Sequence, residues 1–176
     1  MLIRLLPHLK MLPRPPLELC NEAETEESRE TPVCFYELKF YALSNFSAFE
    51  VEIGSMVYPT AEHAYQAAKF PETGLWHNEV ANAPSAHAAM KIAQGQPKPE
   101  GWDDRKREIM KDICRRKLEQ HDYVQDTLQF TGDREIFEVS PTDSFWGWGP
   151  DRAGRNELGK IWMELRTELR DSFPPK

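Results

Sequence analysis

The pattern of apolar and polar residues predicts that the folded part of the chain opens near residue 33 with short strands. Residues 33–36 form a brief apolar run of strand type, and residues 49–53 alternate apolar and acidic side chains, as a half-buried strand does. Gly54 begins a turn, and residues 56–58 return as a second strand. The pattern therefore predicts a β-hairpin that leads directly into the next element.

A helix is predicted from residue 60 to residue 70. Pro59 pushes the residue before it toward extended backbone, and Thr60 is a good N-cap because its hydroxyl can accept a backbone N–H of the first turn. The following residues include four alanines, which are strong helix formers and allow a neighbouring element to approach closely: Ala61, Ala64, Ala67 and Ala68.

One face of this helix is polar. Glu62, Gln66 and Lys69 are spaced i, i+4 and i+7 and so share a face, which Tyr65 borders. Such a stripe is often only a solvated helix surface with one Glu–Lys pairing. An acid, an amide and an amine beside small residues also match a polar site built on a rigid helix. The spacing alone leaves both interpretations open.

Beyond residue 70 the apolar spacing is mostly helical. The longest predicted helix begins at Asp103, runs to about residue 128 and stops before Gly132. Cys114 on its apolar stripe is expected to fill core, and His121 to pack or to cap. The other predicted elements are a helix at 72–81 with Trp76 and Val80 inward, a helix at 86–93 between Ser85 and Gly95, a strand at 135–139, and a core-packed helix at 157–171.

Two segments outside the helices carry candidate binding residues. Asn45 lies in a turn-rich segment, where its amide either binds its own backbone or contacts a ligand. Residues 140–156 form a long loop in which Trp146 offers a flat face for a heteroaromatic ring. The alternative is a loop that plugs the core with its two tryptophans. The loop also contains glycines that allow close backbone approach: Gly147, Gly149 and Gly154.

The end of this loop suggests a place for a phosphate. Asn156 is positioned to cap the final helix, and Arg152 and Arg155 lie beside the positive end of that helix. Free N–H groups at a helix N-terminus bind anions well. We therefore expect a phosphate to be accommodated there.

Composition sets limits on the class of protein. The chain has 176 residues, 40% hydrophobic and 29% charged, which suits one soluble globular domain. A net charge of −7 argues against avid non-specific nucleic-acid binding. No apolar run is long enough to cross a bilayer. Three cysteines, without metal-binding spacing, make a disulfide framework or zinc site unexpected and favour a reducing, cytoplasmic location.

The first 32 residues differ from the rest. Arg4, Lys10 and Arg14 stand among leucines as in a transit peptide, but several prolines break any amphipathic helix, and residues 21–31 then turn acidic. Acidic, Ser/Thr-containing runs are usually disordered. We expect residues 1–32 to be a poorly ordered extension and residues 33–176 to form the folded domain.

At residues 33–172 the chain resembles the NADAR family, also called YbiA-like. The resemblance rests on the order and spacing of several short motifs, each weak alone. They are Phe35-Tyr36, Ser44-Asn45-Phe46, Tyr58-Pro59-Thr60-x-Glu62-His63-x-x-Gln66-x-x-Lys69, Trp102, Thr131-Gly132, Asp143-x-x-Trp146-Gly147-x-Gly149 and Asn156-x-Leu158-Gly159.

The resemblance implies a compact, mostly helical α+β domain with a small β-hairpin or sheet. It also implies a hydrolase that cleaves the bond between ribose C1 and an exocyclic amine. Family members include N-glycosidases of phosphoribosylated aminouracil intermediates in riboflavin biosynthesis, and others that remove ADP-ribose from guanine in nucleic acid. A small phosphorylated ribosyl-amine is the substrate expected here. The open alternatives are ADP-ribosylated nucleic acid as substrate, and a catalytically silent module that binds ADP-ribose or a nucleotide.

With the resemblance added, residue roles can be proposed. Lys69 is the expected nucleophile, whose amine captures ribose C1 as a Schiff base. In the alternative route, an acid protonates the leaving nitrogen and a carboxylate stabilises an oxocarbenium-like centre at C1. Glu62 transfers protons in either route, and Asp143 holds ribose hydroxyls or assists. No cofactor or metal is expected, and the oligomeric state is not legible. The expected substrate-binding residues are Asn45, Phe46, Tyr65, Glu138, Trp146, Gly147, Gly149 and Asn156.

Overall fold

The computed structural model describes residues 31–36 and 40–172. Helices and short strands in two small sheets make up this part of the chain, so the prediction of a mostly helical α+β fold is confirmed. The prediction about residues 1–32 lies, apart from residues 31 and 32, outside the described residues.

The predicted hairpin and the helix after it are present. Strands β2 (Val51–Ile53) and β3 (Met56–Tyr58) pair antiparallel, and α1 (Ala61–Ala67) begins three residues after the hairpin ends. The Thr60 hydroxyl accepts the backbone N–H of His63, as predicted for an N-cap. Every residue of α1 is buried, so its polar side chains are not a solvated surface.

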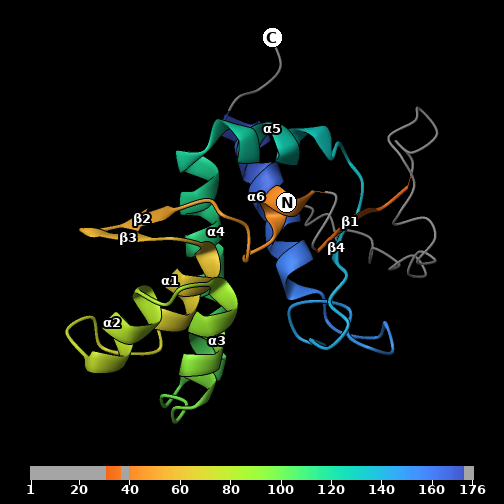
Figure 1. The fold of residues 1–176 in the computed structure, drawn as a ribbon. Coiled ribbons are helices and arrows are strands. Elements are labelled where there is room, and N and C mark those ends of the chain that lie inside the picture. The colour runs from red at the N-terminus through yellow and green to blue at the C-terminus, as the bar shows by residue number, and fades with distance from the viewer. Residues whose placement is uncertain (1–30, 37–39, 173–176) are drawn as a thin grey trace, which may run out of the picture.

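Helices α2 (Leu75–Ala81) and α3 (Ala86–Gln94) pack against α1 and against each other. Figure 1 shows these three helices together beside α4. Val80 is buried, but Trp76 is 42% exposed, so its predicted inward position is wrong. The buried face of α2 is formed by His77, Val80 and Ala81. Trp76 lies four residues before Val80 but about 100° around the helix from His77, so it lies at the edge of the buried face and stays partly exposed.

The predicted long helix is two helices, α4 (Trp102–Gln120) and α5 (Asp122–Phe130). The break lies at His121, whose backbone is extended with φ −136° and ψ 107°. The His121 ring reaches the Glu50 carbonyl oxygen at 2.7 Å and packs edge-on against Phe49. The apolar period continues through the break because both helices face the same core, and so the sequence pattern did not show the bend.

The second sheet pairs the first strand of the domain with a strand that comes much later in the chain. Strand β1 (Val33–Phe35) pairs in parallel with β4 (Ile136–Glu138), and Figure 1 shows them side by side near α6 (Glu157–Ser172). The short 3-10 helix η3 (Tyr41–Leu43) follows β1. Trp162 of α6 is fully buried, and its indole donates to the Leu43 carbonyl at 2.9 Å.

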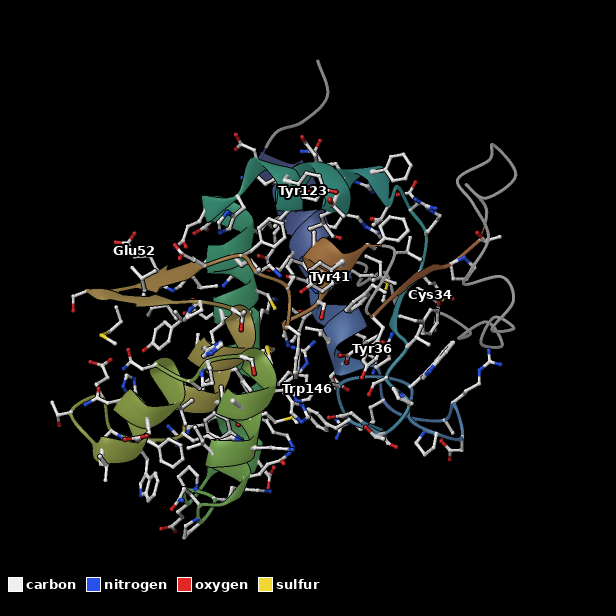
Figure 2. All side chains as sticks on the ribbon, viewed as in Figure 1. Cys34, Tyr36, Tyr41, Glu52, Tyr123 and Trp146 are labelled. Carbon is white, nitrogen blue, oxygen red and sulfur yellow. The ribbon has the colours of Figure 1, made fainter. Side chains whose placement is uncertain are left out.

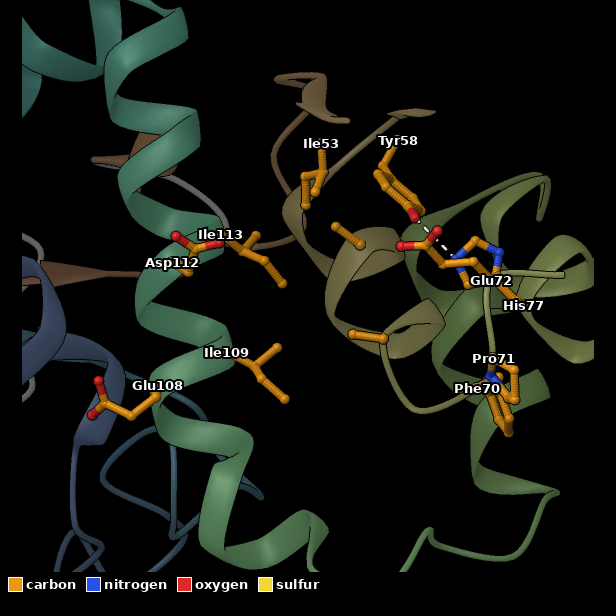
Figure 3. Close-up of a pocket in the computed structure, with 12 residues that line it drawn as sticks. Ile53, Tyr58, Phe70, Pro71, Glu72, His77, Glu108, Ile109, Asp112 and Ile113 are labelled. Atoms are coloured by element: carbon orange, nitrogen blue, oxygen red, sulfur yellow. Dashed lines mark hydrogen bonds between the residues drawn. The ribbon is translucent and has the colours of Figure 1, made fainter. Parts of the chain in front are cut away.

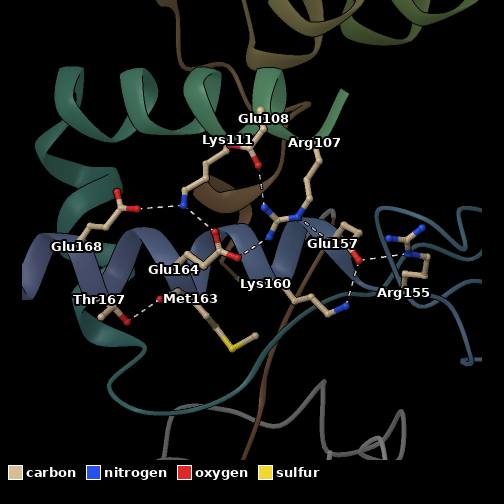
Figure 4. Close-up of polar contacts among 10 residues, drawn as sticks. All are labelled: Arg107, Glu108, Lys111, Arg155, Glu157, Lys160, Met163, Glu164, Thr167 and Glu168. Atoms are coloured by element: carbon tan, nitrogen blue, oxygen red, sulfur yellow. Dashed lines mark hydrogen bonds and ion pairs between the residues drawn. The ribbon is translucent and has the colours of Figure 1, made fainter. Parts of the chain in front are cut away.

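An ion-pair network holds α4 against α6 (Figure 4). Arg107 pairs with Glu157 at 2.8 Å and with Glu164 at 2.5 Å, and Lys111 pairs with Glu164 at 2.7 Å. Several partly buried charges acting together stabilise more than isolated exposed pairs do. The network fixes the first turn of α6 relative to α4, and both elements border the candidate site.

The cysteines occupy different environments. Cys114 is free and fully buried, and burial raises the pKa of its thiol to about 12, so it is core and not a nucleophile, as predicted. Cys34 in β1 is disulfide-bonded, which the cysteine spacing did not lead us to expect. Within the described ranges, no helix is both long and apolar enough to span a bilayer.

Candidate active site

The polar side chains of α1 and of the turn after it form a hydrogen-bonded relay. The helix ends at Ala67, before the predicted residue 70, and Lys69 lies in the turn that follows. Nζ of Lys69 donates to Oε1 of Gln66 at 2.5 Å, and Nε2 of Gln66 donates to Oε1 of Glu62 at 2.7 Å. Glu62 and Gln66 are each 5% exposed, and Lys69 is half-buried. The amine and the carboxylate, nearly two turns apart, are therefore joined through one amide inside the protein.

Burial changes the acidity of both ends of this relay. Desolvation raises the pKa of Glu62 to about 7, with a further increase from the negative charge of Asp143, while Gln66 and Lys69 oppose the shift. Desolvation lowers the pKa of Lys69, opposed by Glu62. Near neutral pH the carboxyl group can both hold and release a proton, and a larger share of the amine is uncharged than in water.

Aromatic rings surround the amine. The Tyr65 ring lies 5.3 Å from the Trp102 ring and 5.5 Å from the Trp146 ring, centroid to centroid, and the Trp146 contact is edge-to-face. Nζ of Lys69 lies 5.6 Å from the Tyr65 centroid and 5.7 Å from that of Trp102. Figure 2 shows Trp146 between α3 and the loop that precedes α6. These contacts bring together α1, the start of α4 and the loop of residues 140–156 that carries Trp146.

Asp143 shapes the loop locally. Its Oδ1 accepts the backbone N–H groups of Phe145 at 2.8 Å and of Trp146 at 2.7 Å, so the carboxylate turns the chain and sets the position of Trp146. The same carboxylate is close enough to influence the pKa values of Glu62 and Glu138. Asp143 is therefore both a positioning group and part of the acidic side of the site.

Glu138, at the end of β4, is the third carboxyl group. Its Oε2 is buried and makes no hydrogen bond to the described residues. Burial first, and then the charges of Asp143 and Glu62, raise its pKa to about 8. A protonated carboxyl group with an unused hydrogen-bonding atom is suited to donate to a ligand. The described part of the chain has no cluster of three or more His, Cys, Asp or Glu side chains arranged for a metal ion.

Asn45 is hydrogen-bonded to the backbone of Glu62. The Asn45 carbonyl accepts the backbone N–H of Glu62 at 2.9 Å, and its side-chain amide contacts Sδ of Met110 at 3.2 Å. It is 5% exposed. Phe46 is 40% exposed, and its carbonyl accepts the Tyr41 hydroxyl. The structure therefore places the Asn45 backbone at the start of α1, directs its side-chain amide to Met110 and Cys114 of α4, and leaves the Phe46 ring at the surface.

The comparisons with known proteins agree with this geometry. Residues 34–170 match the family model described as the NADAR domain. The chain belongs to the NADAR domain family. In structure, this NADAR domain is similar to the Escherichia coli protein YbiA solved by NMR, with a TM-score of 0.74 and 28% identity, over 84% of this chain and 90% of that one.

Named relatives point to one class of enzyme. An N-glycosidase of Nostoc punctiforme is 35% identical over 147 residues, which are 79% of this chain and 93% of the relative. N-glycosidase YbiA of Escherichia coli is 30% identical over 80% of this chain and 90% of its own length. A riboflavin biosynthesis protein of Vibrio vulnificus is 37% identical over 82% of this chain, which spans only 40% of that protein. The expectation of an N-glycosidase-type hydrolase is confirmed.

The phosphate site expected at the start of α6 is closed in this NADAR domain. The N–H groups of Glu157 and Leu158 donate to the carbonyls of Phe145 and Trp146, each at 3.0 Å. The loop thus satisfies the helix N-terminus with its own backbone. The expectation of free N–H groups there is wrong, because sequence alone could not show that the loop folds back onto the helix that follows it.

The Asn156 side chain also has another use than a helix cap. Its Oδ1 accepts the Glu138 N–H at 3.0 Å, and its Nδ2 donates to the Ile136 carbonyl at 2.9 Å. Asn156 therefore clamps β4 and sets the position of Glu138. Gly147 and Gly149 act through packing: a Cβ at Gly147 would meet the Glu138 carbonyl at 2.8 Å, and one at Gly149 would meet Ser144.

Sequence reasoning missed Lys117, which is completely buried in α4. Its Nζ donates to the Ser44 carbonyl at 2.8 Å and to the Ser47 hydroxyl at 2.6 Å, and so holds the turn that carries Asn45. Burial lowers the pKa of Lys117 to about 7. The available signal was a lysine at an apolar position of the α4 stripe.

A separate cavity of about 570 Å³ lies on the other side of α1, between α4 and α2 (Figure 3). Apolar side chains such as Ile109 and Ile113 face it, together with Tyr58 and His77, whose Oη and Nε2 atoms are 3.0 Å apart. Ala64 and Ala68 line it from α1, whereas Glu62, Gln66 and Lys69 are not among its lining residues. The cavity is therefore distinct from the candidate active site.

Proposed function

We propose that this protein hydrolyses the bond between C1 of a phosphorylated ribose and the exocyclic amine of an aminouracil, an intermediate of riboflavin biosynthesis. The observation that carries the proposal is the buried relay from Lys69 through Gln66 to Glu62, beside Asp143 and under Trp146. The names of relatives support the substrate class, since one is an N-glycosidase and another a riboflavin biosynthesis protein.

Lys69 is assigned the role of nucleophile. When the ribosyl ring opens, C1 becomes part of an imine with the exocyclic nitrogen. The neutral Lys69 amine adds to C1 and expels the aminouracil, leaving C1 as a Schiff base on Nζ, which water then hydrolyses to the free sugar phosphate. The lowered pKa of Lys69 favours the uncharged amine that this step needs.

Glu62 is assigned the proton transfers. With a pKa of about 7, it can give a proton to the departing nitrogen and later take one from the attacking water. Gln66 holds both reacting groups and keeps the amine directed toward the carboxyl group. Asp143 is assigned the role of binding the ribose hydroxyls, because it lies in the loop and is close enough to Glu62 to influence its pKa.

The remaining predicted residues are assigned to binding. Trp146 and Tyr65 provide the ring surfaces against which the base stacks. Glu138 donates to a base carbonyl through its buried carboxyl group. Asn45 and Phe46 border the base, with Asn45 behind Glu62 and Phe46 at the surface. Gly147, Gly149 and Asn156 shape the loop and β4 around these groups.

The test is release of free aminouracil and ribose phosphate from the purified chain. We expect Lys69→Ala and Glu62→Gln each to abolish release while circular dichroism shows an unchanged fold. Borohydride added with substrate should reduce the Schiff base and leave a sugar adduct on Lys69, detected by peptide mass spectrometry. An active enzyme that never gives an adduct would favour an oxocarbenium-like route without covalent capture.

Removal of ADP-ribose from guanine is the second candidate function. The feature that favours it is positive charge beside the site, from Lys98, Lys106 and Arg155, which would suit a polyanion. Incubation with ADP-ribosylated DNA would release ADP-ribose if this is the reaction. Tight ADP-ribose binding with no turnover of either substrate would instead indicate a silent binding module.

A further inference from the structure

Lys106 in the second turn of α4 does not extend freely into solvent. Its side chain is only 18% exposed, and its Nζ lies 3.7 Å from the centroid of the Phe145 ring. Phe145 in turn contacts Trp146 edge-to-face at 4.8 Å between centroids. The ammonium group is therefore separated from the proposed base-stacking ring by a single aromatic side chain.

Lys98, in the loop before α4, lies beside Lys106. The two ammonium groups share one carboxylate: Nζ of Lys98 is 2.8 Å from Oδ2 of Asp103, and Nζ of Lys106 is 2.8 Å from Oδ1. Two positive charges against one negative charge leave a net positive charge at this point. Each ammonium group has three donors, so bonding to Asp103 does not exhaust them.

The field of this pair reaches the proposed nucleophile. Lys98 and Lys106 both act to lower the pKa of Lys69, after the larger effect of burial. Charges that influence the amine from the same side of the site also attract an anion that is bound near it. Arg155 also lies over the Phe145 ring that Lys106 contacts, with its guanidinium carbon 4.7 Å from the ring centroid.

The N-terminus of α6, the kind of site that often binds phosphate, has its first N–H groups already bonded. The first N–H groups of α6 are bonded to the carbonyls of Phe145 and Trp146, as described above. A sugar phosphate bound with C1 at Lys69 must place its phosphate away from C1 by about the width of the ribose ring. Lys106 contacts the Phe145 ring, which contacts Trp146, and Trp146 contacts Tyr65 beside Lys69. A continuous series of ring contacts therefore connects the lysine pair to the proposed position of C1.

We propose that Lys98 and Lys106 form the subsite that binds the 5′-phosphate of the substrate and so selects phosphorylated over unphosphorylated ribosyl-amines. The inference rests on the proposed function for its C1 chemistry. Asp103 orients both lysines, and the phosphate accepts hydrogen bonds from the ammonium N–H groups that Asp103 does not use. The contacts are charge-assisted and partly exposed, so their contribution falls as salt concentration rises.

The test compares two substrates, the phosphorylated ribosyl-aminouracil and its dephosphorylated form. We expect the ratio of their kcat/KM values to fall about 10-fold in Lys106→Gln and further in the double variant with Lys98→Gln, because each variant removes one charge-assisted contact to the phosphate. The loss should appear in KM for the phosphorylated substrate. Arg116→Gln is the matched control: it removes an exposed cation from the same helix, ten residues or about 15 Å further along the axis.

Inorganic phosphate gives a readout that needs no turnover of the variant. It should compete with substrate in the wild-type enzyme and in Arg116→Gln, and compete several-fold less well in the lysine double variant. An unchanged substrate ratio together with unchanged phosphate inhibition in the double variant would overturn the subsite. If neither substrate is hydrolysed by the wild-type protein, the proposed function fails, and direct phosphate binding by calorimetry still decides the lysine pair.

Discussion

Nε2 of Gln66 donates to Oε1 of Glu62 at 2.7 Å, and both side chains of this α1 pair are buried. An amide that donates to a carboxyl oxygen favours the ionised form and therefore opposes the effect of burial on that carboxyl. The same amide accepts from Lys69 through its oxygen. One side chain thus links the acidity of Glu62 to the position of Lys69.

Replacing Gln66 with methionine should raise the pKa of Glu62 above its present value of about 7, because the hydrogen bond that lowers it is lost. We expect kcat to fall about 10-fold, in proportion to the loss of one bond to a charged group, and the acidic limb of the pH–rate profile to move to higher pH. Gln129→Met, at an exposed position of α5, serves as the control. A reduced kcat with an unmoved profile would contradict the link.

Glu138→Gln should change how stability depends on pH. The pKa of Glu138 is raised to about 8 from 4.5, so between these values the folded state binds more protons than the unfolded state, and wild-type stability from this group falls as pH rises. Glutamine cannot ionise. We expect the difference in unfolding free energy, variant minus wild type, to increase from pH 5 to pH 8, measured by urea denaturation. A constant difference would mean that Glu138 is ionised at neutral pH.

Lys117→Met should show the opposite slope at higher pH. The pKa of Lys117 is lowered to about 7 from 10.5, so between these values the unfolded state binds more protons and wild-type stability from this group rises with pH. Relative to the methionine variant, the unfolding free energy of the wild type should increase by on the order of 2–4 kcal/mol between pH 7 and pH 10, measured by urea denaturation. The turn that carries Asn45 should also loosen, which would raise KM.

Gly159→Ala should destabilise the protein by about 1–3 kcal/mol, because an added Cβ would clash with the backbone carbonyl of Ile136 and push α6 away from β4. Gly95→Ala is the matched control. Gly95 has helical backbone with φ −72°, and its new Cβ would have ordinary contacts from 3.4 Å. We expect that variant to stay within about 0.5 kcal/mol of wild type. Thermal unfolding of both variants decides whether the close approach of α6 and β4 is required.

Much of the secondary structure could be read from local pattern. Thr60 caps α1, and the hairpin and the α1 polar stripe follow from short-range spacing. The break at His121 could not be predicted, because its cause is a bond to Glu50, far away in the sequence. Trp76 was misplaced because a short helix gives too few apolar positions to fix which face is buried.

By itself, the sequence determined which chemical groups are present and that the carboxyl of Glu62, the amide of Gln66 and the amine of Lys69 lie close together along the chain. It also placed Asp143 and Trp146 in one loop. Only the tertiary structure decided that this face is buried, and burial is what shifts the pKa values of Glu62 and Lys69. It also closed the α6 N-terminus with loop carbonyls and placed Lys117 under the Asn45 turn. The reason is physical: desolvation and long-range hydrogen bonds depend on what lies around a side chain, and local sequence does not specify those surroundings.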